Sequence, residues 1–422
     1  MTYSNLLSKI LKSSNYLIKS EEYRHAYSIG KSFSRNRKLS FANSIYFICS
    51  ALRKSISSEI ANFIEDNSNL DFPNISKQAF SKARQNISYE AFKELCRLFV
   101  EMFYDSNIEL KKWNGFNILA VDGTSLQVPD TSENIEIFGT RKNQYSTKTA
   151  LACASALYDV LNDIVIDAKI TSYPGDERLL ARQHIDTITN PKLLDNTIVT
   201  FDRGYPSYDM FTYLDQKGLF FLMRVSSAFK LANATSSNDS ILTYKVNKTL
   251  KDLRVIKIEL PDGTIETLIT NIFDNNIHPI MFKELYFLRW GIECKYRELK
   301  SSIEIEEFSG NKPITIHQDF YVSIYLSMVT SLIKKESDVA IAKENKEKNL
   351  KSSYHSNRNF IINQVFKKII TMMTKPILGK RIIEKILEKS IKIRSQIRPN
   401  RSCERKNKHP RKKHHNHIKS CI

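Results

Sequence analysis

Acidic residues are scarce in this sequence relative to basic ones. Among 422 residues, 64 are Lys or Arg and only 45 are Asp or Glu, so the formal net charge is +19. The surplus is uneven, because residues 376–422 contain 15 Lys or Arg against 3 Glu. Such a surplus indicates a polyanionic partner, and nucleic acid is the commonest one. A basic protein without such a partner is the alternative.

Cysteines are also few, and none are in CxxC spacing. The six are Cys49, Cys96, Cys153, Cys294, Cys403 and Cys421. This scatter argues against a disulfide framework and favours a reducing compartment. The longest apolar run, residues 320–333, is too short to span a bilayer, and no charged-then-apolar signal sequence opens the chain. We therefore expect a soluble, cytoplasmic protein.

Residues 1–112 have a mostly helical pattern, and we predict that they form a helical DNA-binding domain. Ser76 can cap a short helix over residues 77–85, and Ser88 can cap the next one. This arrangement fits a helix-turn-helix whose polar face reads DNA. The polar residues that the first helix would expose are Lys77, Gln78, Lys82 and Arg84. A helical hairpin with a solvated basic face is the alternative.

The pattern changes to strands from Asn117 onward. Apolar runs predict strands at residues 118–121, 149–157, 164–170, 197–201 and 219–225. Helical periodicity predicts helices at residues 176–188 and 207–217, before and after the fourth strand. This α/β order of elements resembles the ribonuclease H-like fold without its last helix, so we assign residues 113–225 to the first part of such a core.

A β insertion is predicted over residues 226–278. Alternating apolar residues flank an Asp262-Gly263 turn, which is a strong hairpin signal. The missing helix of the core then follows, because residues 279–303 have helical periodicity and begin with Pro279. We assign residues 279–310 to this closing helix.

The rest of the chain is predicted to be helical and then unstructured. Residues 311–375 form the helical C-terminal region, with a buried helix at 319–333, a loose charged linker at 334–358 and an amphipathic helix at 359–374. The basic tail, residues 376–422, is too polar near its end to form a core, so we expect it to be partly disordered.

Three acidic residues occupy positions that suit a metal site. Asp122 and Asp202 each follow a predicted buried strand, and Glu293 lies on the closing helix. Three converging carboxylates can bind two divalent ions about 3.5–4 Å apart, and oxygen ligands favour Mg²⁺ or Mn²⁺. Glu298 competes as the third acid, but it lies about 140° from Glu293 around the helix. A single Asp after a strand is more often a turn residue, so the argument depends on all three acids.

The closing helix also carries basic and phenolic side chains on the face of Glu293. Tyr286, Arg289, Glu293 and Lys300 fall within an arc of about 60°, beside a separate apolar arc. An Arg fork and a Lys charge suit phosphate oxygens. We therefore predict a phosphate-bearing substrate next to the metal site.

These segments together resemble bacterial cut-and-paste DDE transposases. The three matching blocks are VDGTSLQVPDTSENIEIFG, FDRGYPSYDMFTYLDQKGLFFLMRV and YFLRWGIECKYRELK. The third block follows the spacing Tyr-x2-Arg-x3-Glu-x6-Lys, which is typical of the insertion-sequence-four (YREK-type) family. The resemblance covers roughly residues 115–310, and is weaker over the N-terminal helices and absent over the basic tail.

The resemblance implies the roles of the site residues. It implies that Asp122, Asp202 and Glu293 bind two Mg²⁺ ions, with Mn²⁺ as a substitute, and that Tyr286, Arg289 and Lys300 hold the DNA end. Arg203 and Arg224 are candidates for further phosphate contacts, with structural ion pairing as the alternative. The implied reaction is hydrolysis at the ends of an insertion sequence followed by attack of the freed 3′ hydroxyl on target DNA.

The resemblance also implies partners and a place in the cell. The partners are double-stranded DNA, as transposon ends and target, and a second copy of the chain in the synaptic complex. The location is the bacterial cytoplasm, in association with the nucleoid. Two alternatives stay open: a DNA-binding relative without catalysis, and a host nuclease of the same fold that cuts without joining.

Overall fold

The computed structural model describes residues 1–35, 38–50, 55–143, 146–246 and 249–398. The chain divides into two compact units, each assembled from separate stretches of sequence. The first comprises Met1–Ile108, Leu126–Ala152 and Leu299–Ile422, and the second comprises Glu109–Ser125 and Cys153–Glu298. The predicted mixed α/β class is confirmed, because a large mixed sheet and many helices make up the structure.

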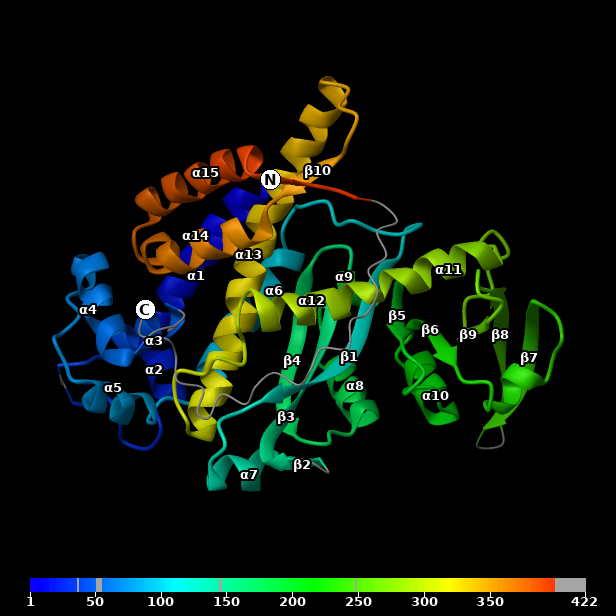
Figure 1. Cartoon of the computed structure of the whole chain (residues 1–422), viewed down its shortest axis with the longest axis horizontal. Helices are drawn as coiled ribbons and strands as arrows, with labels where there is room; N and C mark the ends of the chain where they lie inside the picture. Colours follow the sequence, from blue (N-terminus) through cyan, green and yellow to red (C-terminus); the bar gives the residue numbers. More distant parts are fainter. Residues whose placement is uncertain (36–37, 51–54, 144–145, 247–248, 399–422) are drawn as a thin grey trace. The chain divides into compact units, whose positions relative to one another are not determined.

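A mixed sheet is the framework of the second unit (Figure 1). Its strands are β1 (Asn117–Gln127), β3 (Ser146–Asp159), β4 (Ile164–Ser172), β5 (Thr197–Phe201), β6 (Phe220–Val225), β7 (Asp239–Val246), β8 (Thr249–Glu259) and β9 (Ile265–Thr270). The order is β3-β1-β5-β6-β9-β8-β7, with β4 on the outer side of β3. β1, β5 and β6 are parallel neighbours, whereas β9, β8 and β7 are antiparallel. The parallel strands therefore end at one edge of the sheet, where polar residues can meet.

Asp122 and Asp202 were both predicted to follow directly after a buried strand. This prediction is confirmed for Asp202 after β5 and wrong for Asp122 in β1. Every residue of β5 is buried, and Asp202 comes directly after it. Asp122 was predicted at the end of its strand, yet β1 continues to Gln127. The polar residues after Asp122 concealed this extension. Register pairs Ala120 of β1 with Thr200 of β5, so the two acids follow from neighbouring parallel segments.

Helices of the second unit are α8 (Glu177–Asp186), α9 (Pro191–Leu194), α10 (Tyr208–Gln216), α11 (Pro279–Leu288) and most of α12 (Trp290–Ser301). Helix α11 packs on the sheet through Phe282 and Leu285, which are fully buried against residues of β1, β5, β6, β8 and β9. Burial of each such side chain contributes about 1.5–3 kcal/mol. The apolar arc predicted for the closing helix therefore fixes this helix to the sheet.

The closing helix is not continuous, contrary to the sequence-based prediction. It is interrupted at one residue, Arg289, which separates α11 from α12. The backbone of Arg289 remains in the right-handed helical region, with φ −50° and ψ −33°. Its N–H donates to Tyr286 O at 3.1 Å, so the turn tightens at the residue whose side chain enters the candidate site.

Residues 226–278 form the predicted hairpin and one additional strand. Glu259 of β8 pairs with Ile265 of β9 across the Asp262-Gly263 turn, as expected. Gly263 has φ +79°, a conformation that favours glycine. Strand β7 was not predicted. It is an edge strand in which Tyr244 is the one buried residue among the described residues 239–246, so its sequence lacks the apolar run of a core strand.

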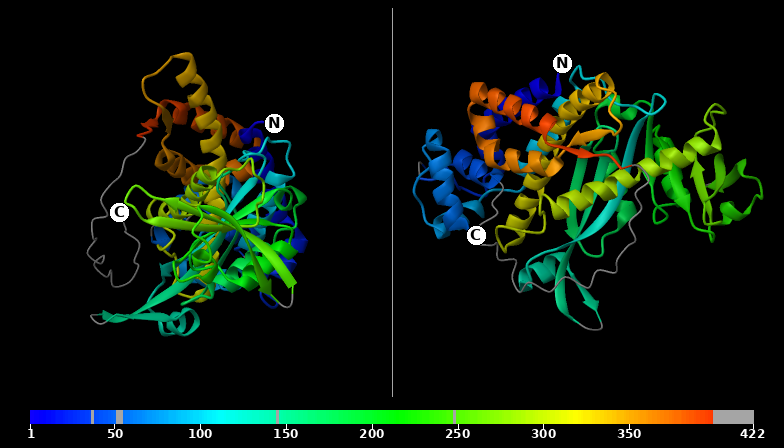
Figure 2. Two further views of the ribbon diagram at one scale, coloured as in Figure 1. Left: turned by 90° about the vertical axis from the view of Figure 1, so that its right-hand side faces the viewer. Right: turned by 45° about the horizontal axis from the view of Figure 1, so that its top comes forward.

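The first unit is mainly helical. Its elements are α1 (Tyr3–Lys19), α2 (Glu21–Tyr27), α3 (Phe41–Cys49), α4 (Ile56–Asp66), α5 (Lys77–Arg84), α6 (Glu90–Tyr104), α7 (Ser132–Phe138), α13 (Pro313–Glu347), α14 (Arg358–Thr374) and α15 (Pro376–Lys392), with the short strands β2 (Thr140–Asn143), β10 (Tyr354–Ser356) and β11 (Arg394–Gln396), the 3-10 turn Ser68–Leu70, and the beginning of β3. Helices α1, α6, α14 and α15 pack around α13 (Figure 2). The N-terminal and C-terminal helices therefore share one core.

Helix α13 is longer than predicted. The charged residues 334–347, expected to be part of a loose linker, continue the helix. Lys334 pairs with Asp338 one turn later, and Ser337 lies buried with its hydroxyl 2.6 Å from that of Ser390 on α15. Packing against α15 stabilises this stretch, which the sequence alone could not show. Helix α15 and strand β11 lie within the predicted basic tail, and the last part of that tail, 399–422, is outside the described residues.

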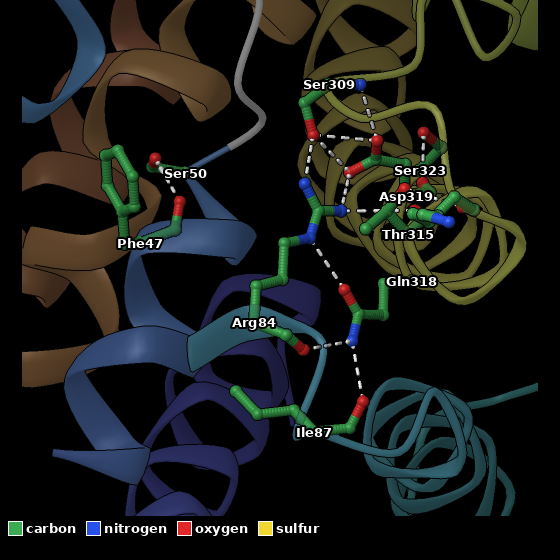
Figure 3. A network of polar contacts seen from close by, with 10 residues as sticks. Phe47, Ser50, Arg84, Ile87, Ser309, Thr315, Gln318, Asp319 and Ser323 are labelled. Atoms are coloured by element: carbon green, nitrogen blue, oxygen red, sulfur yellow. Dashed lines mark hydrogen bonds and ion pairs between the residues drawn. The ribbon is translucent and has the colours of Figure 1, made fainter. Parts of the chain in front are cut away.

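A buried polar network centred on Arg84 links α5 to α13 in the first unit (Figure 3). The Arg84 guanidinium donates to Asp319 Oδ1 at 2.7 Å, to Gln318 Oε1 at 2.6 Å and to Thr315 O at 3.1 Å. Arg84 is 1% exposed. The prediction that Arg84 is exposed to DNA is therefore wrong: the guanidinium is fully engaged inside the protein.

The described part of the chain contains no helix that is both long enough and apolar enough to cross a membrane.

Candidate active site

Asp122 is a largely buried carboxylate in β1. Its Oδ1 accepts a hydrogen bond from the Gly123 N–H at 2.9 Å. Burial raises the pKa of Asp122 to about 7; the Arg289 guanidinium and the Gly123 N–H oppose this shift, whereas the charges of Asp202 and Glu293 add to it. The three predicted acids are therefore close enough to influence one another electrostatically.

Asp202 is held by the turn that follows β5. Its Oδ1 accepts from the Gly204 N–H at 2.8 Å, and its carbonyl oxygen accepts from the Tyr205 N–H at 3.4 Å. Both contacts come from the chain immediately after Asp202, so the Asp-Arg-Gly-Tyr sequence builds this turn locally. The orientation of the carboxylate is consequently set by the backbone.

The guanidinium of Arg289 contacts both Asp122 and Glu293. Its Nη2 donates to Glu293 Oε1 at 2.7 Å, and its Nη1 lies 3.9 Å from Asp122 Oδ2. The guanidinium is 7% exposed and lies 5.6 Å from the centre of the Tyr286 ring. Its Nε is buried with no hydrogen-bond partner within the described residues. A buried cation with an unused N–H can donate a hydrogen bond to a further oxygen.

Tyr286 and Tyr296 flank this arrangement. Burial raises the pKa of Tyr286 to about 12, so its phenol stays protonated at neutral pH. Tyr296 donates through its hydroxyl to the carbonyl oxygen of Asp122 at 2.8 Å, which ties α12 to β1. The sequence gives no signal for this contact, because Asp122 is 174 residues away.

Asp122, Asp202 and Glu293 are close together, but their carboxylates are not arranged as a complete set of metal ligands. Within the described residues, no group of three or more His, Cys, Asp or Glu side chains is already arranged to hold a metal ion. Glu298, the competing third acid, lies 3.4 Å from the ammonium of buried Lys295, which also pairs with Asp163 at 2.6 Å. Glu293 shares Arg289 with Asp122, whereas Glu298 belongs to a separate ion-pair network.

The remaining residues predicted to contact phosphate differ in their exposure and in their ion pairs. Arg203 is exposed beside Asp202. Arg224 is 39% exposed and its Nε lies 3.3 Å from Glu266 Oε1, which favours the structural alternative for this residue. Lys300 lies in the last turn of α12, where the chain already belongs to the first unit.

In the first unit, three of the four predicted DNA-reading residues are exposed on α5. These are Lys77, Gln78 and Lys82. A pocket of about 630 Å³ lies beside this helix. Basic and apolar side chains line this pocket. The basic ones are Lys31, Arg35, Lys38 and Lys82, and the apolar ones are Phe33, Leu39, Ile75, Ala79 and Ala83.

Comparison with known proteins decides the family. The family described as "Transposase DDE domain" matches residues 113–328, just over half of the chain. The chain belongs to the DDE transposase family. The matched residues, 113–328, include Asp122, Asp202 and Glu293, and members of the family use divalent metal ions.

The similarity to individual proteins is low in sequence identity. The chain is 21% identical over 270 residues to the transposase InsG for insertion sequence element IS4 of Escherichia coli (strain K12), covering 59% of each protein. It is 27% identical over 150 residues to InsZ of the same organism, covering 34% of this chain and 47% of InsZ. The chain therefore spans between about half and three fifths of the length of these relatives.

Among solved structures, a piggyBac transposase synaptic complex with hairpin DNA is similar at a TM-score of 0.46 and 10% sequence identity. The similarity covers 92% of this chain and 82% of that one.

Proposed function

We propose that this protein is the DNA transposase of an insertion sequence, which binds terminal inverted repeats, cleaves the DNA there and joins the freed 3′ ends to target DNA. The observation that carries the proposal is the proximity of Asp122 to Asp202 and Glu293, with the buried guanidinium of Arg289 in contact with Asp122 and Glu293. Phosphoryl transfer needs carboxylates for metal ions and a cation for the phosphate, and this cluster supplies both.

A ribonuclease H-like core accounts for the arrangement of these acids. The order β4-β3-β1-β5-β6, with β1, β5 and β6 parallel, supports this assignment. Residues 226–278 then constitute an insertion between β6 and the closing helix. We propose domain limits of 1–112, 113–225, 226–278, 279–310, 311–375 and 376–422.

The donor chemistry of the site fits two Mg²⁺ ions, with Mn²⁺ as a substitute. The available donors are carboxylate and phenol oxygens, which hard divalent ions prefer. The Tyr205 hydroxyl is also buried without a partner within the described residues, so it is available to an additional ligand. We assign Asp122, Asp202 and Glu293 as the residues that hold the ions. When bound, the ions activate the attacking oxygen and stabilise the leaving oxygen.

Arg289 and Tyr286 would position the DNA end. The Arg289 guanidinium now contacts two carboxylates, and a phosphate offers it equivalent oxygens in the same fork geometry. Tyr286, as a protonated phenol, can donate to a phosphate oxygen. Lys300 and Arg203 are proposed as additional phosphate contacts, whereas the ion pair with Glu266 favours a structural role for Arg224.

DNA binding away from the cleavage point is assigned to the first unit and the tail. Lys77, Gln78 and Lys82 are exposed on α5 beside the basic pocket, which suits backbone contacts. The basic residues of 376–422 add non-specific affinity. We further propose that two copies of the chain pair the two ends of the element, and that DNA binding keeps the protein on the bacterial nucleoid.

The test is cleavage of a linear DNA that carries one end of the element, with Mg²⁺ present. We expect Asp122→Asn, Asp202→Asn and Glu293→Gln each to reduce end cleavage by about 10³-fold or more, because each removes an ionic ligand. Glu259→Gln, which changes an exposed carboxylate of β8, serves as the matched control. If all three variants cleaved as well as the control, the assignment of the site would be wrong.

A second substrate separates joining from simple cutting. A DNA end that has already been cleaved should be joined to a target plasmid by the wild-type protein. Cleavage without joining of this substrate would instead support a nuclease, and end binding without either reaction would support a DNA-binding relative that lacks catalysis.

A further inference from the structure

Glu177 is an acidic residue at the candidate site that the sequence analysis did not select. It is the first residue of α8, and its side chain is accessible to solvent. A Cβ atom placed on Gly123 would lie 3.3 Å from Glu177 Oε1, and one placed on Gly204 would lie 3.4 Å from Glu177 Oε2. The carboxylate therefore reaches between the residue after Asp122 and the turn that holds Asp202. A side chain at either glycine would crowd it.

Asp202 is close to the same carboxylate. The Cβ position on Gly204 is 3.1 Å from Asp202 Oδ1, so Glu177 and Asp202 approach Gly204 together. Partial burial and then the negative charge of Asp202 raise the pKa of Glu177. Two carboxylates that face one another repel, and a shared divalent ion removes that repulsion.

A buried chain of hydrogen bonds fixes α8, and with it Glu177, relative to Asp122. His184 of α8 lies fully buried, with Nδ1 2.7 Å from Asp167 Oδ2 and Nε2 3.0 Å from Ser155 Oγ. The Ser155 hydroxyl also donates to the carbonyl oxygen of Asp122 at 3.3 Å. Glu177 is thus carried by a helix that is tied to the strand of Asp122.

The hydroxyl of Tyr205 gives separate evidence for a ligand beside Glu177 and Asp202. Its side chain is fully buried, and its hydroxyl has no hydrogen-bond partner within the described residues. Burial raises the pKa of Tyr205, and the charges of Glu177, Asp122 and Asp202 raise it further, so the phenol is a protonated donor next to three carboxylates. A buried hydroxyl without a partner costs about 1–3 kcal/mol, which a bound ligand or its water can recover.

We propose that Glu177 is a fourth carboxylate of the divalent-metal centre, shared with Asp202, and that the Tyr205 hydroxyl hydrogen-bonds to a water or oxygen ligand of that ion. The inference rests on the proposed function, because it assumes that the site of Asp122, Asp202 and Glu293 binds metal. It assigns to the chain a ligand that lies on none of the three sequence blocks of the family resemblance.

Mn²⁺ binding to the full chain without DNA tests this assignment, read by calorimetric titration and by the paramagnetic resonance of free Mn²⁺. We expect Glu177→Gln to weaken binding of one ion by about 10-fold or more. Tyr205→Phe should weaken the same ion by a smaller factor. Glu259→Gln, an exposed control of the same type, should bind as wild type does. Equal Mn²⁺ binding by Glu177→Gln and the control would overturn the proposal.

The thermal midpoint in EDTA separates a ligand from a structural residue. Loss of the Glu177 charge relieves repulsion with Asp202, so the metal-free Tm of Glu177→Gln should equal or exceed that of wild type. Weaker Mn²⁺ binding together with a lower metal-free Tm would assign Glu177 a structural role and overturn the proposal.

Asp202→Asn distinguishes failure of this inference from failure of the proposed function. If Asp202→Asn loses Mn²⁺ and Glu177→Gln does not, only the fourth ligand is refuted. If Asp122→Asn, Asp202→Asn and Glu293→Gln all retain wild-type Mn²⁺ binding, the metal centre itself is refuted, and the inference with it.

Discussion

Replacing Asp122 by Asn should stabilise the metal-free protein, although Asp122 is assigned a central role. The pKa of this carboxyl is about 7 in the folded protein, raised from 3.8 mainly by burial. The folded state therefore binds the proton more tightly than the unfolded state between these two values, and stability falls as the pH rises from about 4 to about 7. A difference of about three pKa units corresponds to about 4 kcal/mol, which is the upper limit for the penalty at neutral pH.

Asn removes this penalty and keeps a carbonyl oxygen for the Gly123 N–H. The gain in free energy of unfolding should therefore be present above pH 7 and disappear toward pH 4. For a unit of roughly 150–250 residues, the limit of about 4 kcal/mol corresponds to a rise in Tm on the order of 10 °C. Asp122→Asn also removes the attraction between the Asp122 carboxylate and the Arg289 guanidinium, whose nearest atoms are 3.9 Å apart. This loss is small, because that attraction already lowers the pKa of Asp122 and the value of about 7 includes it.

The assay is thermal unfolding in EDTA at about pH 8 and about pH 5, followed by circular dichroism. The Tm difference between Asp122→Asn and wild type should be positive at the higher pH and clearly smaller at the lower one. Glu259→Gln should show no such pH-dependent difference. A lower Tm for Asp122→Asn at the higher pH, or a difference independent of pH, would refute the reasoning.

Three further outcomes are expected. Arg84→Ala should lower the stability of the first unit by about 3–5 kcal/mol in thermal or urea unfolding, because it removes the cationic partner of the Asp319 carboxylate. Lys82→Ala, an exposed neighbour, should leave the midpoint unchanged. Arg289→Lys should reduce the rate of end cleavage by about 10²-fold while affecting the apparent KM little, because it keeps the charge and loses the fork; a purely altered KM would contradict this. Deletion of residues 399–422 should make the log–log salt dependence of DNA affinity less steep by about 0.9 for each phosphate that the tail neutralises in the intact chain, and an unchanged slope would show that the tail does not contact DNA.

The elements that the sequence predicted well are those with a purely local cause. Strand β5 is a continuous apolar run with turn residues on both sides, and α10 begins where Ser207 accepts a hydrogen bond from the Met210 N–H. The Asp262-Gly263 turn likewise determines the β8–β9 hairpin. In each case the residues that decide the structure are adjacent in sequence, so pattern and outcome agree.

Elements that depend on distant partners were predicted less well. Residues 334–347 have the composition of a linker, yet they remain helical because they pack against α15 and form ion pairs one turn apart. Arg84 appears as one more basic residue of an exposed helix, and its partner Asp319 is 235 residues away. No periodicity within either segment contains this information.

The candidate site shows the same division. The spacing of Tyr286, Arg289 and Glu293 along one helix made them visible, and Asp202 directly follows an apolar strand. Glu177 and Tyr205 could not be found in this way, because only the folded sheet and α8 bring them near Asp122. Acids that begin a helix are common, so Glu177 carried no signal of its own.

The Arg84 network ties α5, the proposed DNA-binding helix, to the central helix of the first unit. Arg84 is the last residue of α5, and its guanidinium holds Asp319 and Gln318 of α13, while the amide of Gln318 donates to the carbonyl oxygens of Arg84 and Ile87. Because these hydrogen bonds hold the end of α5 to α13, the proposed contact between α5 and DNA would be anchored to the central helix of the first unit. Replacement of Asp319 would then weaken the proposed DNA binding, although Asp319 itself would not contact the duplex.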